Sequence, residues 1–138
     1  NTDTTLTIPS TSERVITVGA YDSANISTVG FSGRGYTRAT EYIKPDLVAP
    51  GVNILTTTVG ESITSFTGTS AAAPFVAGSA ALLMEWGIVD RNDIFLYGER
   101  LKAFLCNGAI RDNSREYPNR EWGYGRLCLK NTLDLLKK

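Results

Sequence analysis

Residues 71–86, AAAPFVAGSAALLMEW, form the most apolar stretch of the chain. Apolar side chains fall on almost every side of a helix with 3.6 residues per turn, so this helix must be covered by other layers of structure. The run is interrupted by Pro74 and closes at Glu85, well short of the ~20 residues that span a bilayer. We therefore predict a core helix that is enclosed on all sides, and no membrane partner.

Segments rich in β-branched residues precede this helix, and amphipathic segments follow it. A bend is expected at Pro50-Gly51, within the extended stretch 46–58. In the segment 92–109, Asp93 is well placed for the first turn of a helix and Gly108 for its C-terminal cap. Strands interleaved with helices predict an α/β fold with a mostly parallel sheet. Further strands are predicted at 14–20 and 62–68, and a last helix from Leu129.

The length and composition of the chain limit the kinds of partner it can have. Its 138 residues suffice for one domain with a buried core. Fourteen basic and 14 acidic residues give a formal net charge of zero, which argues against nucleic acid or an acidic membrane surface as a partner. Cys106 and Cys128 are the only cysteines, and small secreted domains held by disulfides usually carry more. Two buried thiols are therefore favoured, with a disulfide between them as the alternative.

The first ten residues, NTDTTLTIPS, contain no initiator methionine, no basic segment and no apolar segment. They match neither a signal peptide nor the natural start of a protein. We therefore expect the chain to begin within a longer protein.

Ser70 stands where a predicted strand meets the apolar helix. The first N–H groups of a helix lack helical acceptors, and the helix dipole adds positive potential there, so this place can stabilise an oxyanion beside a serine nucleophile. Pro74 has no N–H to donate to the Ser70 carbonyl, which predicts an irregular first turn. Serines at helix starts are more often caps than nucleophiles, so the surrounding motif has to decide.

Two common serine-enzyme motifs do not fit. The G-x-S-x-G elbow requires glycine where Ala72 stands, and none of the five lysines has serine three residues before it, as S-x-x-K requires. The motif that fits is G-T-S-x-A-x-P followed by V-A-G, from Gly68 to Gly78. With KPDLVAPGV at 44–52 and VITVGAYD at 15–22, it resembles the subtilisin-like serine proteases in order and approximate spacing.

This resemblance implies a three-layer α/β subtilisin-like fold with a mostly parallel sheet, of which residues 1–138 are the C-terminal portion. In that family an Asp and a His precede the serine along the chain, and this chain has no histidine. The resemblance therefore implies that the Asp, the His and an oxyanion Asn lie before residue 1. We expect the isolated chain to be inactive and to need the missing N-terminal half of the same domain as a partner. Alone, it is expected to expose an apolar strand edge, to leave the central helix uncovered on one side, and therefore to self-associate.

The family's site roles carry over to matching positions. Ser70 would be the nucleophile of a serine endopeptidase that hydrolyses polypeptides through an acyl-enzyme. The backbone N–H of Ser70 and Thr69 would serve the oxyanion hole. Gly68, Thr67 and Thr7 would contact substrate, with Thr7 near the floor of the specificity pocket. The resemblance implies no metal in this segment and no cofactor.

Two departures and two alternatives accompany this interpretation. Ala71 and Phe75 replace the Met and His common in the family, which changes the leaving-group side of the cleft. The alternatives are a catalytically dead subtilase-like pseudoprotease that acts by binding, and a serine-carboxyl peptidase relative whose base is an upstream Glu–Asp pair. The tail GYGRLCLKNTLDLL, with MEWGIV, further resembles subtilases of anaerobic spore-forming bacteria, which implies a secreted, cell-envelope or spore-associated parent protein.

Overall fold

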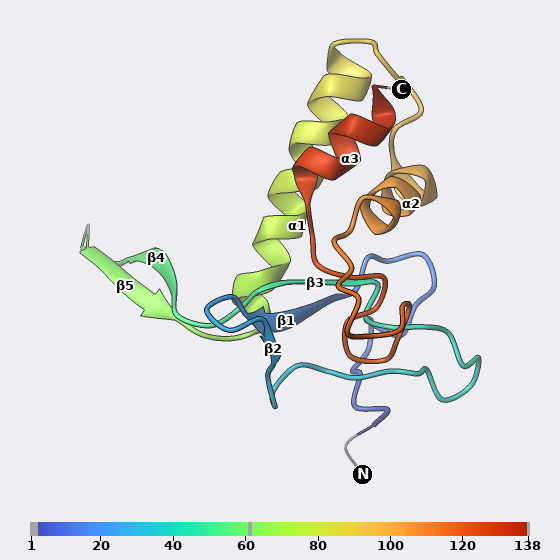
Figure 1. The fold of residues 1–138 in the computed structure, drawn as a ribbon. Coiled ribbons are helices and arrows are strands. Elements are labelled where there is room, and N and C mark those ends of the chain that lie inside the picture. The colour runs from blue at the N-terminus through green and yellow to red at the C-terminus, as the bar shows by residue number, and fades with distance from the viewer. Residues whose placement is uncertain (1–2, 61, 138) are drawn as a thin grey trace.

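The computed structural model describes residues 3–60 and 62–137 and combines a small sheet, a separate hairpin and three α-helices (Figure 1). The α/β class predicted from the sequence is confirmed. The strands are β1 (Val18–Asp22), β2 (Ser27–Thr28), β3 (Leu47–Pro50), β4 (Ile54–Thr58) and β5 (Ser62–Phe66). The helices are α1 (Thr69–Met84), the π-helix η1 (Glu85–Val89), α2 (Gly98–Asn107) and α3 (Leu129–Leu136).

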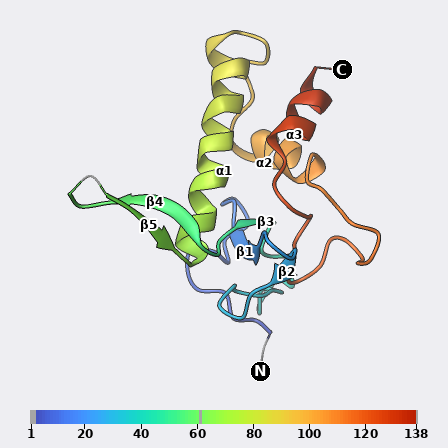
Figure 2. The ribbon, with the colours of Figure 1, turned by 60° about the vertical axis from the view of Figure 1, so that its left-hand side comes forward.

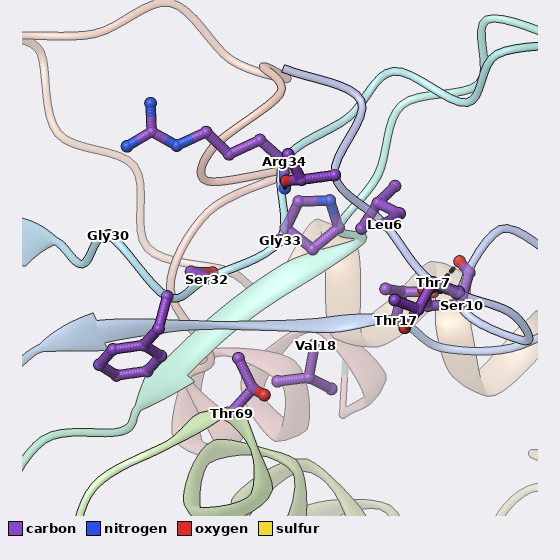
Figure 3. Close-up of a pocket in the computed structure, with 13 residues that line it drawn as sticks. Leu6, Thr7, Ser10, Thr17, Val18, Gly30, Ser32, Gly33, Arg34 and Thr69 are labelled. Atoms are coloured by element: carbon purple, nitrogen blue, oxygen red, sulfur yellow. Dashed lines mark hydrogen bonds between the residues drawn. The ribbon is translucent and has the colours of Figure 1, made fainter. Parts of the chain in front are cut away.

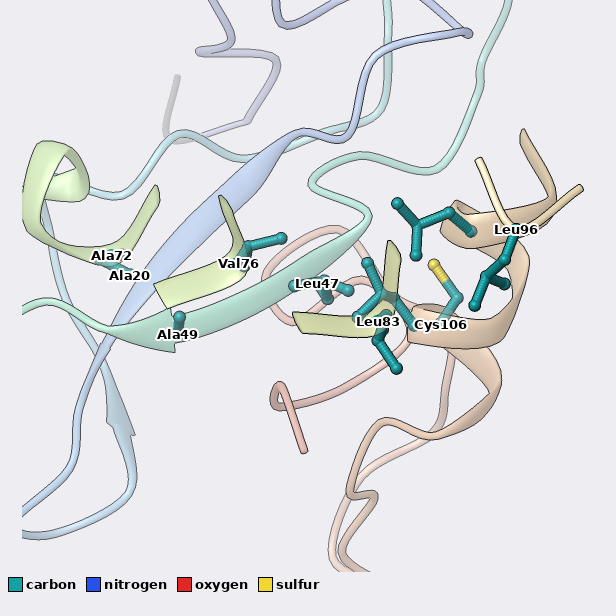
Figure 4. Close-up of a cluster of buried hydrophobic side chains, with 10 residues drawn as sticks. Ala20, Leu47, Ala49, Ala72, Val76, Leu83, Leu96 and Cys106 are labelled. Atoms are coloured by element: carbon teal, nitrogen blue, oxygen red, sulfur yellow. The ribbon is translucent and has the colours of Figure 1, made fainter. Parts of the chain in front are cut away.

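The sheet has the order β2-β1-β3, with β1 parallel to β3 and antiparallel to β2. Because side chains alternate along a strand, the sheet has two different faces. Ala20 of β1 and Leu47 and Ala49 of β3 pack into the helix-side core, which Figure 4 shows closing around Val76 and Leu83 of α1.

On the opposite face of the sheet, Tyr21 and Val48 pack against Trp122, which is only 2% exposed. The backbone beyond Trp122 then runs along β3. Val48 donates to the Gly125 carbonyl at 3.0 Å and accepts from Leu127 N–H at 2.9 Å, and Tyr124 N–H donates to the Asp46 carbonyl at 2.8 Å. The segment 124–127 therefore covers the outer edge of β3.

Helix α1 stands on the sheet and packs on β1 and β3 through one side (Figures 1 and 2). Its buried residues, Ala72, Val76, Ser79 and Leu83 with Ala71, recur at helical spacing. One side of the helix is uncovered among the described residues, as predicted for this chain without the rest of its domain. Within residues 3–60 and 62–137 no layer covers the opposite side, where Leu82 is 53% exposed.

Helix α1 begins at Thr69, before the apolar run at 71–86, and continues into η1, which ends at Val89, after that run. Residues Thr69–Val89 form a helix of 21 residues, and an 18-residue window of it has a mean hydropathy of 1.5, so by length and composition alone it could cross a membrane. The core helix of an α/β domain meets the same two criteria, so this single helix is weak evidence for a membrane span.

The bend predicted at Pro50-Gly51 separates β3 from β4, and β4 pairs with β5 in an antiparallel hairpin. Figure 1 shows this hairpin projecting away from the sheet. Its side chains are mostly exposed, including Leu55 and Ile63. The hairpin thus brings the chain back to the sheet at Gly68, where Gly68 N–H donates to the Gly51 carbonyl at 2.8 Å.

The helix predicted over 92–109 is shorter than expected. Asp93 does not lie in the first turn of α2; it lies in the preceding loop, where its carboxylate accepts hydrogen bonds from Phe95 N–H and from Arg100. The C-terminal cap at Gly108 is confirmed. An added Cβ there would sit 2.3 Å from Thr132 Oγ1, so this glycine permits the close approach of α2 and α3.

Both cysteines are free, with Cys106 buried in the core and Cys128 half-buried. Burial raises the pKa of the Cys106 thiol to about 11, with Asp46 adding to the effect. At pH 8 only about one such thiol in a thousand is ionised, and the thiolate is the reactive form. We expect iodoacetamide to alkylate Cys128 at least about ten times faster than Cys106 in the folded chain, by peptide mass spectrometry. Equal rates in 6 M guanidinium are the control, and equal rates in the folded chain would contradict the burial of Cys106.

Candidate active site

Three parts of the chain converge where α1 begins. The bend at Gly51 passes so close to β1 that an added Cβ would lie 2.6 Å from the Ala20 Cβ and 3.0 Å from the Gly68 carbonyl oxygen. Gly68 itself is extended, and Ala71 N–H donates to its carbonyl at 3.0 Å to open the first turn. The glycine at 51 therefore allows the close packing that fixes the start of α1 against the sheet.

Ser70 is the second residue of α1, and it is exposed. At this position its backbone N–H has no acceptor within the helix, and the positive end of the helix dipole lies beside it. Pro74 lies inside α1, so the Ser70 carbonyl also lacks its usual helical donor. These features give an accessible hydroxyl next to a free N–H donor, which is the arrangement that stabilises an oxyanion.

Hollows flank Ser70 on two sides. One, of about 350 Å³, lies between α1 and the hairpin and is lined by apolar residues that include Phe66, Pro74 and Phe75. The other, of about 340 Å³, is lined by Pro9, Ser10 and residues 15–18. Ser70 lies in the walls of both, so an extended chain passing over it would have space on either side.

A larger hollow of about 460 Å³ adjoins this region through Thr69 (Figure 3). Thr7, Ser10 and Thr17 also line it, together with Arg34, whose guanidinium is paired with Glu121 at 2.7 Å. The structure thus brings Thr7 and Thr69, two of the residues predicted to serve the site, to one hollow.

The remaining predicted residues lie at the entrance to α1. Gly68 forms the turn described above. The Thr67 hydroxyl accepts a hydrogen bond from Asn53 N–H at 2.9 Å, which ties the two ends of the hairpin together. Thr67 therefore has a visible structural role beside Ser70.

Ser70 has no base beside it in the part of the chain that the structure describes. Across residues 3–60 and 62–137, no side chain is hydrogen-bonded to Ser70 Oγ, and the whole sequence contains no histidine. A neutral serine hydroxyl is a weak nucleophile without a proton acceptor. The described residues therefore supply an exposed hydroxyl and a free N–H donor at Ser70, without a group that could take the hydroxyl proton.

Sequence reasoning missed a buried ionic cluster behind the site. Asp46 accepts from Lys44 Nζ and from Lys102 Nζ, each at 2.8 Å, and its side chain is 3% exposed. Burial lowers the pKa of Lys44. Burial also acts to lower the pKa of Lys102, but the hydrogen bond and charge of Asp46 outweigh it, so the pKa of Lys102 is raised. The KPD sequence at 44–46 places Lys44 and Asp46 close together in the chain, which could have indicated an ion pair. Lys102 comes from α2, and nothing near it in the sequence indicated its contact with Asp46.

A family model described as the subtilase family matches residues 1–125. This chain belongs to the subtilase family. The resemblance noted in the sequence is therefore confirmed, and Ser70 lies within the matched range. The match ends just beyond Trp122, so it also includes this residue, which packs on the face of the sheet opposite to α1.

Individual proteases resemble the chain along nearly its whole length. The structure of the Clostridium perfringens CspB protease is 51% identical, with a TM-score of 0.95 over 99% of this chain. The structure of the prenylagaramide maturation protease PagA is 27% identical, with a TM-score of 0.77 over 98%. The serine protease AprX of Bacillus subtilis (strain 168) is 32% identical over 94% of this chain. These matches confirm the subtilase-like fold.

This chain covers a much smaller share of each relative's own length. This chain spans 32% of AprX, 30% of the CspB chain and 47% of the PagA chain. Most of each relative therefore has no counterpart among these 138 residues.

Proposed function

We propose that Ser70 is the nucleophile of a subtilisin-like serine endopeptidase, and that its base belongs to a part of the protein outside these 138 residues. The observation that carries the proposal is the exposed Ser70 hydroxyl at the start of α1, beside an N–H with no helical acceptor. Family membership and the relatives named as proteases support it.

The reaction would be an acyl transfer. Ser70 Oγ attacks the carbonyl carbon of the scissile peptide as the base takes the hydroxyl proton. The negative charge that forms on the carbonyl oxygen is stabilised by the Ser70 N–H, with the Thr69 hydroxyl as an auxiliary donor. The C–N bond then breaks, the amine leaves with the proton from the base, and water hydrolyses the ester on Ser70.

A polypeptide substrate would lie across the hollows on either side of Ser70. Gly68 offers a close approach to backbone because it has no side chain. Thr67 and Thr7 are assigned to substrate contact, and Thr7 lies in the same hollow as Thr69. The apolar hollow beside Phe66 and Phe75 is assigned to the leaving-group side, where Ala71 replaces the bulkier Met of many subtilases.

The chain by itself is expected to be inert as a peptidase. Removing the histidine of subtilisin, a member of the same family, costs about a million-fold in kcat, and this chain carries no histidine. If the whole protein also lacks a base, the alternative is a pseudoprotease that binds polypeptides without cleaving them.

Fluorophosphonate labelling followed by intact-mass measurement tests this proposal. We expect the full-length protein to gain one adduct at Ser70, while the 138-residue chain and the Ser70→Ala variant of the full-length protein gain none. No labelling of the full-length protein would overturn the proposal in favour of the pseudoprotease. Labelling of the isolated chain would contradict its expected inertness.

The pH dependence of labelling separates the two kinds of base. A histidine base loses its activity as the pH falls through about 6.5, whereas a carboxylate base remains active down to about pH 4. We expect labelling to fall below about pH 6. Full labelling at pH 4.5 would favour the serine-carboxyl peptidase alternative.

A further inference from the structure

The turn at residues 7–12 forms a wall beside Ser70. Thr7 and Ser10 line the larger hollow with Thr69, and Pro9 and Ser10 line the smaller hollow with Ser70. Local hydrogen bonds shape the turn, because Ser10 donates through both its N–H and its hydroxyl to the Thr7 carbonyl, and Ser12 N–H donates to Pro9. These bonds set the form of the turn but do not attach it to the sheet.

Thr17 provides that attachment. Its hydroxyl donates to the Ser10 carbonyl at 2.6 Å, and Thr17 is only 7% exposed. Figure 3 shows Thr7, Ser10 and Thr17 grouped at one end of the hollow. The bond therefore ties the turn to the residue that immediately precedes β1.

Asp46 in turn holds Thr17. Asp46 Oδ2 accepts from Thr17 N–H at 2.6 Å, and Asp46 N–H donates back to the Thr17 carbonyl at 2.8 Å. Because Asp46 directly precedes β3, this reciprocal pair fixes Thr17 to the beginning of β3.

The two lysines complete the anchor. Lys44 Nζ donates to the Val15 carbonyl at 2.9 Å, and Lys102 Nζ donates to the Glu13 carbonyl at 2.7 Å, while both pair with Asp46. The backbone of residues 13–17 is thus bound at several points to one buried carboxylate and its two ammonium partners. A buried polar network in which every member is bonded is rigid.

We propose that Asp46 is a positioning residue that acts through Thr17 to hold the turn at residues 7–12 against Ser70. The inference rests on the proposed function, because it assigns that turn to the substrate side of the peptidase site. A displacement of about 1 Å in a substrate-positioning group can cost about a hundred-fold in rate. Loosening the turn therefore impairs the use of peptide substrates more than the reactivity of Ser70 itself.

Thr17→Val in the full-length protein tests this link. Valine keeps the shape of threonine and the N–H that donates to Asp46, and it removes only the hydroxyl that donates to Ser10. We expect kcat/KM for peptides to fall about ten- to a hundred-fold, with little change in the rate of labelling by a small fluorophosphonate. Thr17→Ser, which retains the hydroxyl, is expected to restore kcat/KM to within about threefold of the unmodified protein.

Amide hydrogen exchange gives a readout that does not depend on activity. In Thr17→Val, the amides of residues 7–12 are expected to exchange at least about ten times faster, with the rest of the chain unchanged. Thr132→Val is the matched control, because the hydroxyl of the fully buried Thr132 also donates to a backbone carbonyl, that of Cys128 just before α3, at 3.0 Å. The control is expected to leave both the exchange of residues 7–12 and kcat/KM unchanged.

Unchanged exchange of residues 7–12 in Thr17→Val would overturn the positioning role, as would a rise spread evenly over the chain. Faster local exchange with unchanged kcat/KM would also overturn it. If the unmodified full-length protein neither cleaves peptides nor reacts with a fluorophosphonate, the proposed function fails instead. The exchange measurement then still decides whether Thr17 holds the turn.

Discussion

Replacing Ser70 by alanine in the full-length protein is expected to lower kcat for peptide hydrolysis about a million-fold. In subtilisin, a member of the same family, loss of the serine alone costs about 2 × 10⁶ in kcat, and that known value sets the size of the effect. The substitution removes the atom that forms the acyl-enzyme, while the helix and the hollows beside it remain. We therefore expect KM to change by less than about threefold, as measured by steady-state kinetics with a fluorogenic peptide.

Ser62→Ala is the control for this experiment, because Ser62 is an exposed serine of β5 at the far end of the hairpin. It is expected to leave kcat within about twofold of the unmodified protein. A Ser70→Ala variant that keeps more than about 1% of the activity would show that another residue is the nucleophile.

Replacing Asp46 by alanine is expected to reduce the free energy of unfolding of the 138-residue chain by about 3–5 kcal/mol. The substitution leaves two lysine ammonium groups without their shared carboxylate, and Lys44 is 1% exposed. Removing one partner of a buried ion pair carries a cost of this size because the remaining charge is uncompensated. Urea unfolding followed by the fluorescence of Trp122 and Trp86 provides the measurement.

The exposed pair of Lys130 and Asp134, whose atoms lie 2.6 Å apart, supplies the matched control. Asp134→Ala is expected to change the free energy of unfolding by no more than about 0.5 kcal/mol, because solvent screens pairs of this kind. A cost below about 1 kcal/mol for Asp46→Ala would show that the buried cluster does not anchor residues 13–17.

Local sequence signals predicted the elements nearest Ser70 well. Pro50-Gly51 marked the bend after β3, and the run of Ala and Leu marked α1, because each of these depends on neighbouring residues only. The G-T-S-x-A-x-P motif identified Ser70 as the candidate nucleophile. The structure then placed that serine, exposed, at the start of α1.

Long-range features were not predictable in the same way. The contact between Asp46 and Lys102 joins residues far apart in the chain. Asp93 forms an ion pair with Arg100 from a loop, although its position in the sequence suggested the start of a helix. The all-round apolar pattern of α1 indicates that the helix needs covering layers, but it does not identify the residues that supply them. These features depend on tertiary packing that periodicity does not encode.

The segment 124–127 also determines the direction in which the sheet can grow. By pairing with β3 it occupies that outer edge, so no further strand can add there. Within the described residues, the opposite side of β1 is paired with the two residues of β2 at Tyr21 and Asp22, and the Ala20 N–H on that side donates to the Ser32 hydroxyl at 3.0 Å. Strands contributed by other parts of a longer protein would therefore join beside the beginning of β1, next to residues that share a hollow with Ser70. A strand added at that edge would therefore lie close to Ser70, which has no base beside it among the described residues.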